Sequence, residues 1–495
     1  MKRQDRLRLG AALGSALFLS GTLHAALADT TDDLLDRLRD KGILTPDEYN
    51  ALKQRKATEQ PPQAPAAVTP APGTGPQGLP APLSATAGPP PAGPFITMMD
   101  KGIGLHVGPV DVSISGNVNA FYTHDMPDHP GASTAVSGGL ANTGNNDSAA
   151  IRSGLLPGNF SIKLATQQEG YDIGVTFGLY PGISSVNNVG GANSAGNPRG
   201  LGTSGIDFRQ QFITVGTPRM GTFKAGRDIG LFGQEAILND FTLFGAGSPG
   251  GNIAPSNTTL GRIGLGYIYT DFMPQFTYTS PTFAGFQASA GVFQPLDAFN
   301  FSGASGTLTG HDAPQVQAKL AYTMPKGWLG PVSAKLWTNV VAQNSQGEAA
   351  GEALAAKKGV TSAGIDYGAK LELGPAAIVL YGYNADGIGT TGLLFDAVSA
   401  TGAKRGSGGG YVQGTYTFFD RLTFGASYGV SHLSLAPGEV NPTLVRDNEA
   451  EIVGVHYKLT DWVNLVAEYA HTQTKAHGGN GAVSDTVAAG TILFF

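Results

Sequence analysis

The sequence predicts an all-β fold, a closed antiparallel barrel of sixteen strands that crosses a membrane. Strand-like alternation of apolar and polar residues recurs from residue 110 to residue 495. Along that stretch, short turns and long loops alternate strictly. The chain ends in an apolar strand with Phe495 as its last residue, whereas a soluble domain usually ends in a polar tail. A sheet with apolar faces toward lipid must close on itself, because an open edge would leave backbone groups unpaired.

Composition excludes several other classes of protein. The 495 residues include no Cys, so a disulfide framework and thiolate sites are excluded. No run of about 18 apolar residues follows the N-terminus, so no helix is expected to span a membrane. The 72 Gly residues and the low charged fraction of 14% suit strands that are apolar on one face and small or polar on the other.

Residues 1–28 predict a secretory signal peptide. Four basic residues precede an apolar run from Leu9 to Leu19, and Ala26-Leu27-Ala28 offers a cleavage site. Without this segment the chain has 27 basic and 36 acidic residues, a net charge of −9. Nucleic-acid binding needs a basic field, so no nucleic-acid partner is expected.

Two further segments precede the barrel domain of residues 95–495. Residues 29–59 predict two short periplasmic helices, the second starting with Thr45 as N-cap and Pro46 as first helical residue. Each is too short to be stable alone, so the pair forms a coiled-coil-like segment with itself or with neighbouring subunits, or else is a weakly helical tail. Residues 60–94 contain no charged residue and are rich in Pro and Ala, which predicts a flexible linker.

The first predicted strand, residues 110–122, has the cleanest alternation. One parity is apolar: Val110, Val112, Ile114, Val118, Ala120 and Tyr122. The other is polar: Asp111, Ser113, Ser115, Asn117 and Asn119. This length crosses a bilayer, for which about 9–11 tilted residues suffice.

The connections between strands give the stronger indication of a barrel. Short turns are expected at residues 168–170, 217–219, 281–284, 324–330, 373–375, 419–420 and 460–461. Long loops rich in Gly, Asn and Ser are expected at about 124–157, 181–205, 228–261, 294–313, 344–360, 385–407, 433–447 and 474–483. Seven turns and eight loops join sixteen strands, with eighteen as the alternative because residues 261–280 read as one strand or two. A soluble propeller or sandwich would not explain this rhythm.

Two motifs and the C-terminus resemble a known family. The segment Ser280-Pro281-Thr282-Phe283-Ala284-Gly285-Phe286 is similar to the S-P-x-F-x-G-F turn of general trimeric Gram-negative outer-membrane porins, and Gly226-Arg227-Asp228 is similar to their fifth-strand exit. Phe495 resembles the terminal Phe that the barrel-assembly machinery reads. The resemblance implies a homotrimer in the outer membrane, in contact with lipid and lipopolysaccharide. The leader is instead similar to that of phosphate-type and dicarboxylate-type porins.

The resemblance also implies that the third long loop folds into the barrel and narrows it. Residues 228–244 are far more apolar than the other loops, so they need a wall to pack against. The inner barrel wall is one candidate, and a subunit interface or the underside of other loops is the alternative. The acids of this loop are Asp228, Glu235 and Asp240.

Basic residues are expected on the wall that opposes the loop. Strand parity directs Lys163, Arg209, Lys319 and Lys335 inward, together with Asp207, Gln211, Asp366 and Lys370. On the same strand as Arg209, the residues of the opposite parity are expected to face lipid: Ile206, Phe208, Gln210 and Phe212. Lys224 and Arg227 lie next to the loop. Loop acids and wall bases together would set up a transverse field that selects polar solutes, although each charge alone suits a solvated lumen equally well.

These patterns predict an outer-membrane porin, a passive diffusion channel for small hydrophilic solutes and ions. A substrate-specific channel for phosphate, dicarboxylate or sugar is the alternative, and a structural tether whose periplasmic segment contacts peptidoglycan is the second. No catalytic motif or metal-ligand spacing is present, so neither an enzyme nor a cofactor is expected. The sequence leaves the preference for anions or cations open.

Overall fold

The computed structural model describes residues 96–99, 102–128, 132–183, 205–249, 258–325, 327–347 and 359–495. The predicted signal peptide, helical segment and linker of residues 1–94 lie outside the described residues and stay predictions. Within the described part of the chain, no helix is long and apolar enough to cross a membrane.

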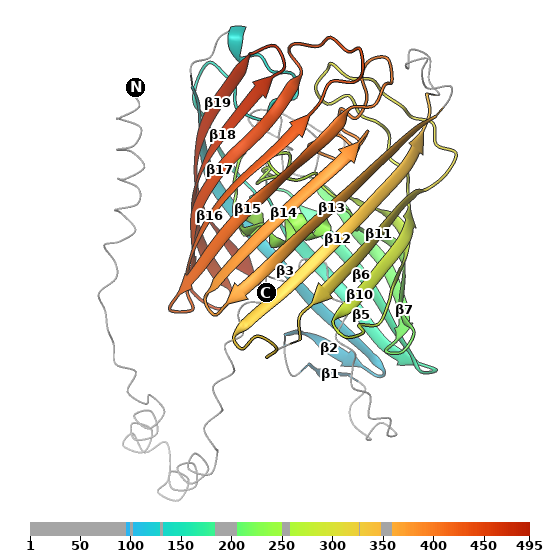
Figure 1. The fold of residues 1–495 in the computed structure, drawn as a ribbon. Coiled ribbons are helices and arrows are strands. Elements are labelled where there is room, and N and C mark those ends of the chain that lie inside the picture. Colours follow the sequence, from blue (N-terminus) through green and yellow to red (C-terminus); the bar gives the residue numbers. More distant parts are fainter. Residues whose placement is uncertain are drawn as a thin grey trace, which may run out of the picture. The chain divides into compact units, whose positions relative to one another are not determined.

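Sixteen antiparallel strands form one closed barrel (Figure 1). They are β3 (Val110–Asp128), β5 (Asn159–Gln168), β6 (Tyr171–Pro181), β7 (Ile206–Thr217), β8 (Gly221–Ile229), β9 (Phe272–Thr279), β10 (Phe286–Phe293), β11 (Gln315–Thr323), β12 (Val332–Ser345), β13 (Val360–Leu373), β14 (Ala376–Asp386), β15 (Gly406–Phe418), β16 (Leu422–Leu433), β17 (Val445–Lys458), β18 (Val463–Ala476) and β19 (Gly481–Phe494). Each strand pairs with the next along the chain, and β19 pairs with β3 to close the ring. The predicted fold class and the count of sixteen are confirmed.

Three short strands lie outside this ring. β1 (Ile96–Met98) and β2 (Ile103–Val107) form a hairpin on the first residues of β3, at the same end as the short turns. β4 (Ser148–Arg152) pairs with the far end of β3, inside the first long loop. That loop also contains a 3-10 turn, η1 (Ala132–Thr134).

The short turns and long loops lie at opposite ends of the barrel, as Figure 1 shows. Residues 261–280 form neither one long strand nor two, because only Phe272–Thr279 is strand and the preceding residues belong to the third loop. Aromatic side chains at the turn end are exposed, with Phe283 at 83%, Trp328 at 70% and Phe419 at 90%. Exposed aromatic residues at one rim are typical of the interfacial girdle of a membrane barrel.

The barrel closes at the last residue of the chain. The backbone N–H of Phe495 donates to the carbonyl oxygen of Gly116 at 3.1 Å, and the N–H of Gly116 donates to the carbonyl oxygen of Phe495 at 3.0 Å. A Cβ at residue 116 would lie 2.8 Å from Cζ of Phe495 and 2.2 Å from the carbonyl oxygen of Asn159. Gly116 therefore leaves room for the Phe495 ring against the wall.

The inward and outward faces follow strand alternation except where the register shifts, at the start of β17 between Val445 and Asp447 and in β7. The register between β6 and β7 shifts between Gly178 and Tyr180, and two residues of β7 there oppose one of β6. This bulge reverses the parity of the strand beyond it. Gln210 is consequently buried and Gln211 is exposed. The prediction that Gln210 and Phe212 face lipid and Gln211 faces inward is therefore wrong.

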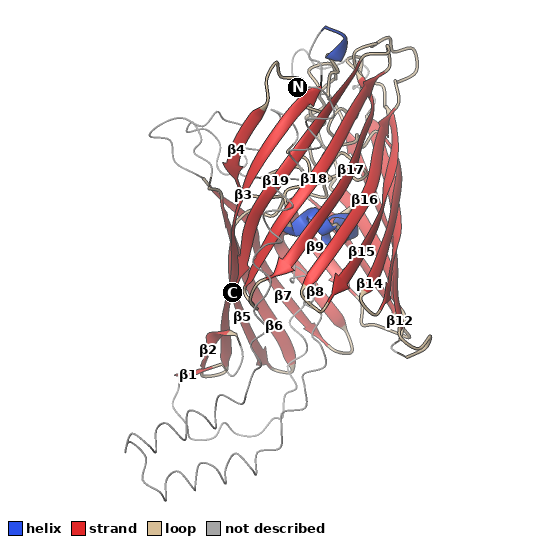
Figure 2. Cartoon of the chain, turned by 90° about the vertical axis from the view of Figure 1, so that its left-hand side faces the viewer, coloured by secondary structure: helices blue, strands red, loops and turns tan. Residues whose placement is uncertain are grey.

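The main hydrophobic core lies inside the barrel. It joins Leu140 of the first loop, Phe232 and Leu265 of the third loop and Leu393 of the sixth loop to wall residues such as Val379. Figure 2 shows the helical part of the third loop within the barrel, about midway along its length. Three loops thus fill part of the lumen with apolar side chains.

Candidate pore site

The third loop, described at residues 230–249 and 258–271, supplies the helical segments inside the barrel. After β8 the chain turns at Gly233, whose φ of 74° is the left-handed conformation that favours glycine. The helix α4 (Gln234–Asn239) and the 3-10 turn η2 (Phe241–Phe244) follow. The N–H of Gly233 donates to Oδ2 of Asp366 on β13 at 2.7 Å, which fixes the start of the helix to the wall.

One ionic contact, called here the lysine contact, joins the loop to β11 and β12. Nζ of Lys319 lies 2.9 Å from Oε1 of Glu235, and Nζ of Lys335 lies 2.7 Å from Oε2 of the same carboxylate. Glu235 is 1% exposed. Burial by itself would raise the pKa of Glu235, but the two ammonium groups outweigh that effect and hold the pKa at about 2.

A second contact, called here the glutamate contact, joins the loop to β18. Oε2 of Glu468 accepts the backbone N–H groups of Ala246 at 2.7 Å and of Gly247 at 2.8 Å. Glu468 is not among the residues predicted from the sequence. Its position was nevertheless visible in the sequence, because it is the one acid in the inward parity of residues 464–476, among Val466, Ala470 and hydroxyl residues.

Amide side chains of the wall also bind the loop backbone, before the lysine contact and after it. Oε1 of Gln317 on β11 accepts the N–H groups of Leu231 at 2.6 Å and of Phe232 at 2.8 Å. On β15, Oε1 of Gln413 accepts the N–H of Phe241 at 2.8 Å. Such bonds satisfy backbone groups that burial would otherwise leave unpaired, so the loop is held along its length.

Asp240, a predicted pore acid, is 3% exposed and lies within the loop. Its carboxylate accepts the Thr242 N–H at 3.0 Å and the Tyr267 hydroxyl at 3.0 Å. Burial raises the pKa of Asp240, while the charge of Arg262 lowers it. Asp240 thus stabilises the fold of the loop and does not face the lumen in this structure.

Asp228, the third predicted acid, is also fully buried, at the end of β8. Its carboxylate forms an ion pair with Nζ of Lys224 and accepts a hydrogen bond from Nε2 of Gln210 at 2.9 Å. Lys163 lies in the same region of the wall. Across neighbouring strands, Lys163 is opposite Thr176, Thr176 is opposite Phe212, and Phe212 is opposite Gly226, which lies between Lys224 and Asp228 on β8.

Arg209 and Arg227 differ in position although both were predicted beside the pore. Arg209 is 8% exposed, lies 2.8 Å from Asp207 Oδ2 and stacks over the ring of Tyr180 with its guanidinium carbon 5.3 Å from the ring centroid. Arg227 pairs with the exposed Pro274 and has the opposite parity from Lys224. The prediction that Arg227 lines the lumen is therefore wrong.

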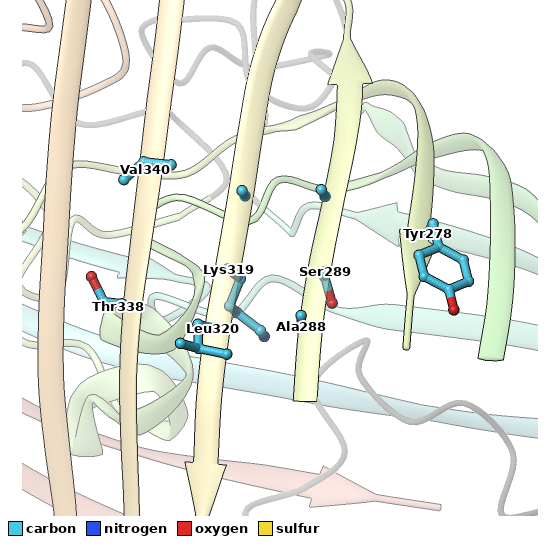
Figure 3. Close-up of a pocket in the computed structure, with 9 residues that line it drawn as sticks. Tyr278, Ala288, Ser289, Lys319, Leu320, Thr338 and Val340 are labelled. Carbon is cyan, nitrogen blue, oxygen red and sulfur yellow. The ribbon is translucent and has the colours of Figure 1, made fainter. Parts of the chain in front are cut away.

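A shallow apolar groove of about 310 Å³ lies on the outer side of the barrel wall (Figure 3). Tyr278, Ala288, Ala290, Leu320 and Val340 line it, on the outward parity of β9 to β12. Its place on the outer face separates it from the lumen.

Comparisons with known proteins agree with this architecture. A model of the Gram-negative porin family matches residues 81–477. The outer membrane channel DcaP of Acinetobacter baumannii has a TM-score of 0.56 at 15% identity, and the match covers 81% of this chain and 99% of that chain. OmpF of Salmonella typhi, solved in complex with daunomycin, has a TM-score of 0.50 at 13% identity over 79% of this chain and 100% of that one. No curated protein matches the sequence.

The closed barrel, its alternating connections and the loop bound to its inner wall define the class of outer-membrane channel barrels. At such identities the structural likeness shows the fold alone. The family match spans most of the chain, and the chain therefore belongs to the Gram-negative porin family and resides in the outer membrane.

Proposed function

We propose that this porin is a passive diffusion channel for small hydrophilic solutes and ions, and that the third loop narrows its lumen. The observation that carries the proposal is the course of residues 230–249, which bind β11, β13, β15 and β18 from inside the barrel. A loop bound to the wall at several strands reduces the cross-section that a solute can use. A narrowed pore selects solutes by size and by the charges exposed along it.

The buried loop acids change which charges can act on a solute. Glu235, Asp240 and Asp228 are each at most 3% exposed, so their carboxylates contact the protein rather than the lumen. The wall bases Lys224 and Lys335 keep exposed side-chain fractions of 23% and 34%. The field in the channel therefore rests on the wall lysines more than on the loop acids.

Planar-bilayer recording of the purified full chain tests this proposal. We expect stable ohmic steps in salt solution, with no saturation as the solute concentration rises. Complete absence of conductance would contradict a channel. Block by low concentrations of phosphate, a dicarboxylate or a sugar would favour the substrate-specific alternative instead.

The outer wall supports the proposal that the chain assembles as a homotrimer. On the outward face of β17 to β19, Glu451 lies opposite His471, which lies opposite Asp485. Nδ1 of His471 is 2.7 Å from Oδ1 of Asp485, and Nζ of Lys475 is 2.6 Å from Oε1 of Glu449. Charged groups on a lipid face are destabilising, so a neighbouring subunit is the expected cover for this sector. The mass of the detergent-extracted protein tests the assembly, and a monomer would contradict it.

We also propose that the protein contacts lipopolysaccharide, the barrel-assembly machinery and peptidoglycan. The backbone pairing of Phe495 with Gly116 supports a role for the terminal residue in closing the barrel. The tether function depends on residues 29–94. It predicts that removing these residues leaves conductance unchanged and weakens attachment to the cell wall.

A further inference from the structure

We propose that the turn-side half of the lumen favours anions, because five inward lysines there expose positive charge that their carboxylate partners do not balance. The proposal rests on the channel function proposed above and names the solute class of that channel. The solutes it fits are small anions, such as chloride and compounds with carboxylate or phosphate groups.

The five lysines lie at a similar level of the barrel. Each is three to five residues from the turn end of its strand, and the strands are β5, β8, β11, β12 and β13. The residues are Lys163, Lys224, Lys319, Lys335 and Lys370. Because the turn ends form one rim of the barrel, this spacing places the lysines on one band in the turn-side half of the barrel.

All five face inward. Lys319 and Lys335 reach Glu235 of the third loop, and Lys224 reaches the buried Asp228. Lys370 lies directly opposite Lys335 in the register of β12 and β13, and directly opposed residues share a face. Like charges directly opposite each other repel, and Glu235 and Glu372, which lie 2.7 Å and 2.6 Å from these two ammonium groups, offset part of that repulsion.

The carboxylates that pair with these lysines are fewer and mostly covered. Glu235 serves two lysines, Asp228 serves Lys224, and Glu372 lies 2.6 Å from Nζ of Lys370. In the described part of the chain, these five lysines form ion pairs with three carboxylates. A fourth carboxylate, Asp366 on β13, lies in the same cross-strand row as Lys319, but it is fully buried and is bound by the N–H of Gly233 and by Nδ2 of Asn339, so at least one positive charge remains in excess. Moreover, the side chains of Asp228 and Glu235 are 1% and 2% exposed, while those of their lysine partners are 13% to 34% exposed. A solute at this level meets ammonium groups more than carboxylates.

Other inward acids near the rim do not reverse this balance. Asp111 and Asp172 lie within one residue of the start of their strands, nearer the turn end than the lysines. Asp111 is 2.6 Å from a ring nitrogen of His106, and Asp172 accepts a hydrogen bond from Gln167. Glu468 is occupied by two backbone N–H groups of the third loop.

Lysine suits a diffusion channel better than a tight binding site. Its ammonium is a compact, strongly hydrated charge on a flexible stem, without the fixed fork that lets arginine bind a carboxylate or phosphate with two bonds. The lysine band should therefore raise the local concentration of anions, and it should do so less at high ionic strength because salt screens exposed charges.

The test is the reversal potential of the full-length protein in planar bilayers across a potassium chloride gradient. We expect chloride to permeate several-fold better than potassium, and the ratio to fall toward one in the variant with Lys224→Gln, Lys335→Gln and Lys370→Gln. Lys475→Gln is the control matched to Lys370→Gln alone, because each removes one positive charge, and Lys475 lies on the outer wall, so its loss should leave the ratio unchanged. The corresponding Lys→Arg variants should retain the preference for anions.

Two outcomes would overturn the inference while leaving the channel intact. One is a conducting wild-type protein that prefers potassium, and the other is a triple variant with an unchanged permeability ratio. Complete lack of conductance in the wild type would instead contradict the proposed function. If the triple variant fails to fold, Lys370→Gln alone decides, because its partner Glu372 is 45% exposed and tolerates the loss.

Discussion

The third loop is held to the barrel wall by two contacts of opposite design. In the lysine contact, one loop carboxylate, Glu235, meets two wall ammonium groups, and the bases remain partly exposed. In the glutamate contact, one wall carboxylate, Glu468, meets two loop backbone N–H groups and is buried. The first leaves charge facing the lumen, whereas the second leaves almost none. The comparison suggests that the lysine contact shapes the field and that the glutamate contact fixes the position of the loop.

The largest effect is expected from Glu468→Ala, which breaks the glutamate contact. The change leaves the buried N–H groups of Ala246 and Gly247 without an acceptor, at a cost of about 1–3 kcal/mol each. We expect the loop to detach locally and the single-channel current to fluctuate between levels. Glu468→Gln is the control, since its carbonyl oxygen still accepts from these groups. A steady current of wild-type size in Glu468→Ala would contradict the positioning role.

The next effect concerns the lysine contact and pH. The folded-state pKa of Glu235, about 2, lies below its ordinary value of 4.5. Ionised Glu235 therefore contributes stability that is complete above pH 4.5 and is lost as the pH falls toward 2. The shift corresponds to about 3 kcal/mol. The emission of Trp337, which is buried in the same hydrophobic core as Phe232 and Ala236, should report detachment of the loop over this range once Trp328 and Trp462 are replaced.

Glu235→Gln is the control for that titration. The variant lacks the carboxylate, so its Trp337 signal should lack the transition between pH 4.5 and pH 2. It should also conduct anions with greater preference, because Lys319 and Lys335 lose their counter-charge. If wild type and variant show the same acid transition, Glu235 does not hold the loop.

Much of this architecture could be predicted from the sequence because lipid imposes it. The alternation in Val110–Asp128, the regular exchange of turns and loops and the apolar end at Phe495 all follow from the need to close a sheet in a membrane. The inward positions of Lys163, Lys319 and Lys335 followed from parity alone. They did so because β5, β11 and β12 are regular strands.

The errors occurred where local geometry overrides parity. The bulge in β7 has no sequence marker, so Gln210 was assigned to the wrong face. Burial of Asp240 depends on Tyr267 and Arg262, which follow it by more than twenty residues within the loop. Parity places Glu468 inside the barrel, but its role could not be predicted, because its partners are backbone N–H groups of a loop more than two hundred residues away in the sequence.

A smaller effect is expected from Gly245→Ala, which disturbs the glutamate contact from the loop side. A Cβ on residue 245 would lie 2.0 Å from Oε1 of Glu468. Its φ of −130° is open to any residue, so the conflict is steric and not conformational. We expect a loss of about 1–3 kcal/mol in thermal unfolding of the detergent-solubilised protein, as for other overpacked sites. The double variant Gly245→Ala with Glu468→Ala should lose less than the sum of the two, because the clashing carboxylate is gone.

The smallest effect is expected from Phe494→Ala, and comparison with Phe495→Asp distinguishes the contact with the third loop from the seam where the barrel closes. Phe494 and Phe495 are adjacent, yet Phe494 meets Phe244 of the loop edge-to-face at a centroid distance of 5.3 Å, whereas Phe495 packs beside Gly116. Phe494→Ala removes a contact of about 0.5–1.5 kcal/mol beyond its buried area, so we expect slightly noisier current and normal assembly. Phe495→Asp places a charge at the seam, and we expect less folded barrel in the outer membrane, measured as the heat-modifiable band. Normal assembly of Phe495→Asp would refute the seam role, and impaired assembly of Phe494→Ala would show that loop and seam form one unit.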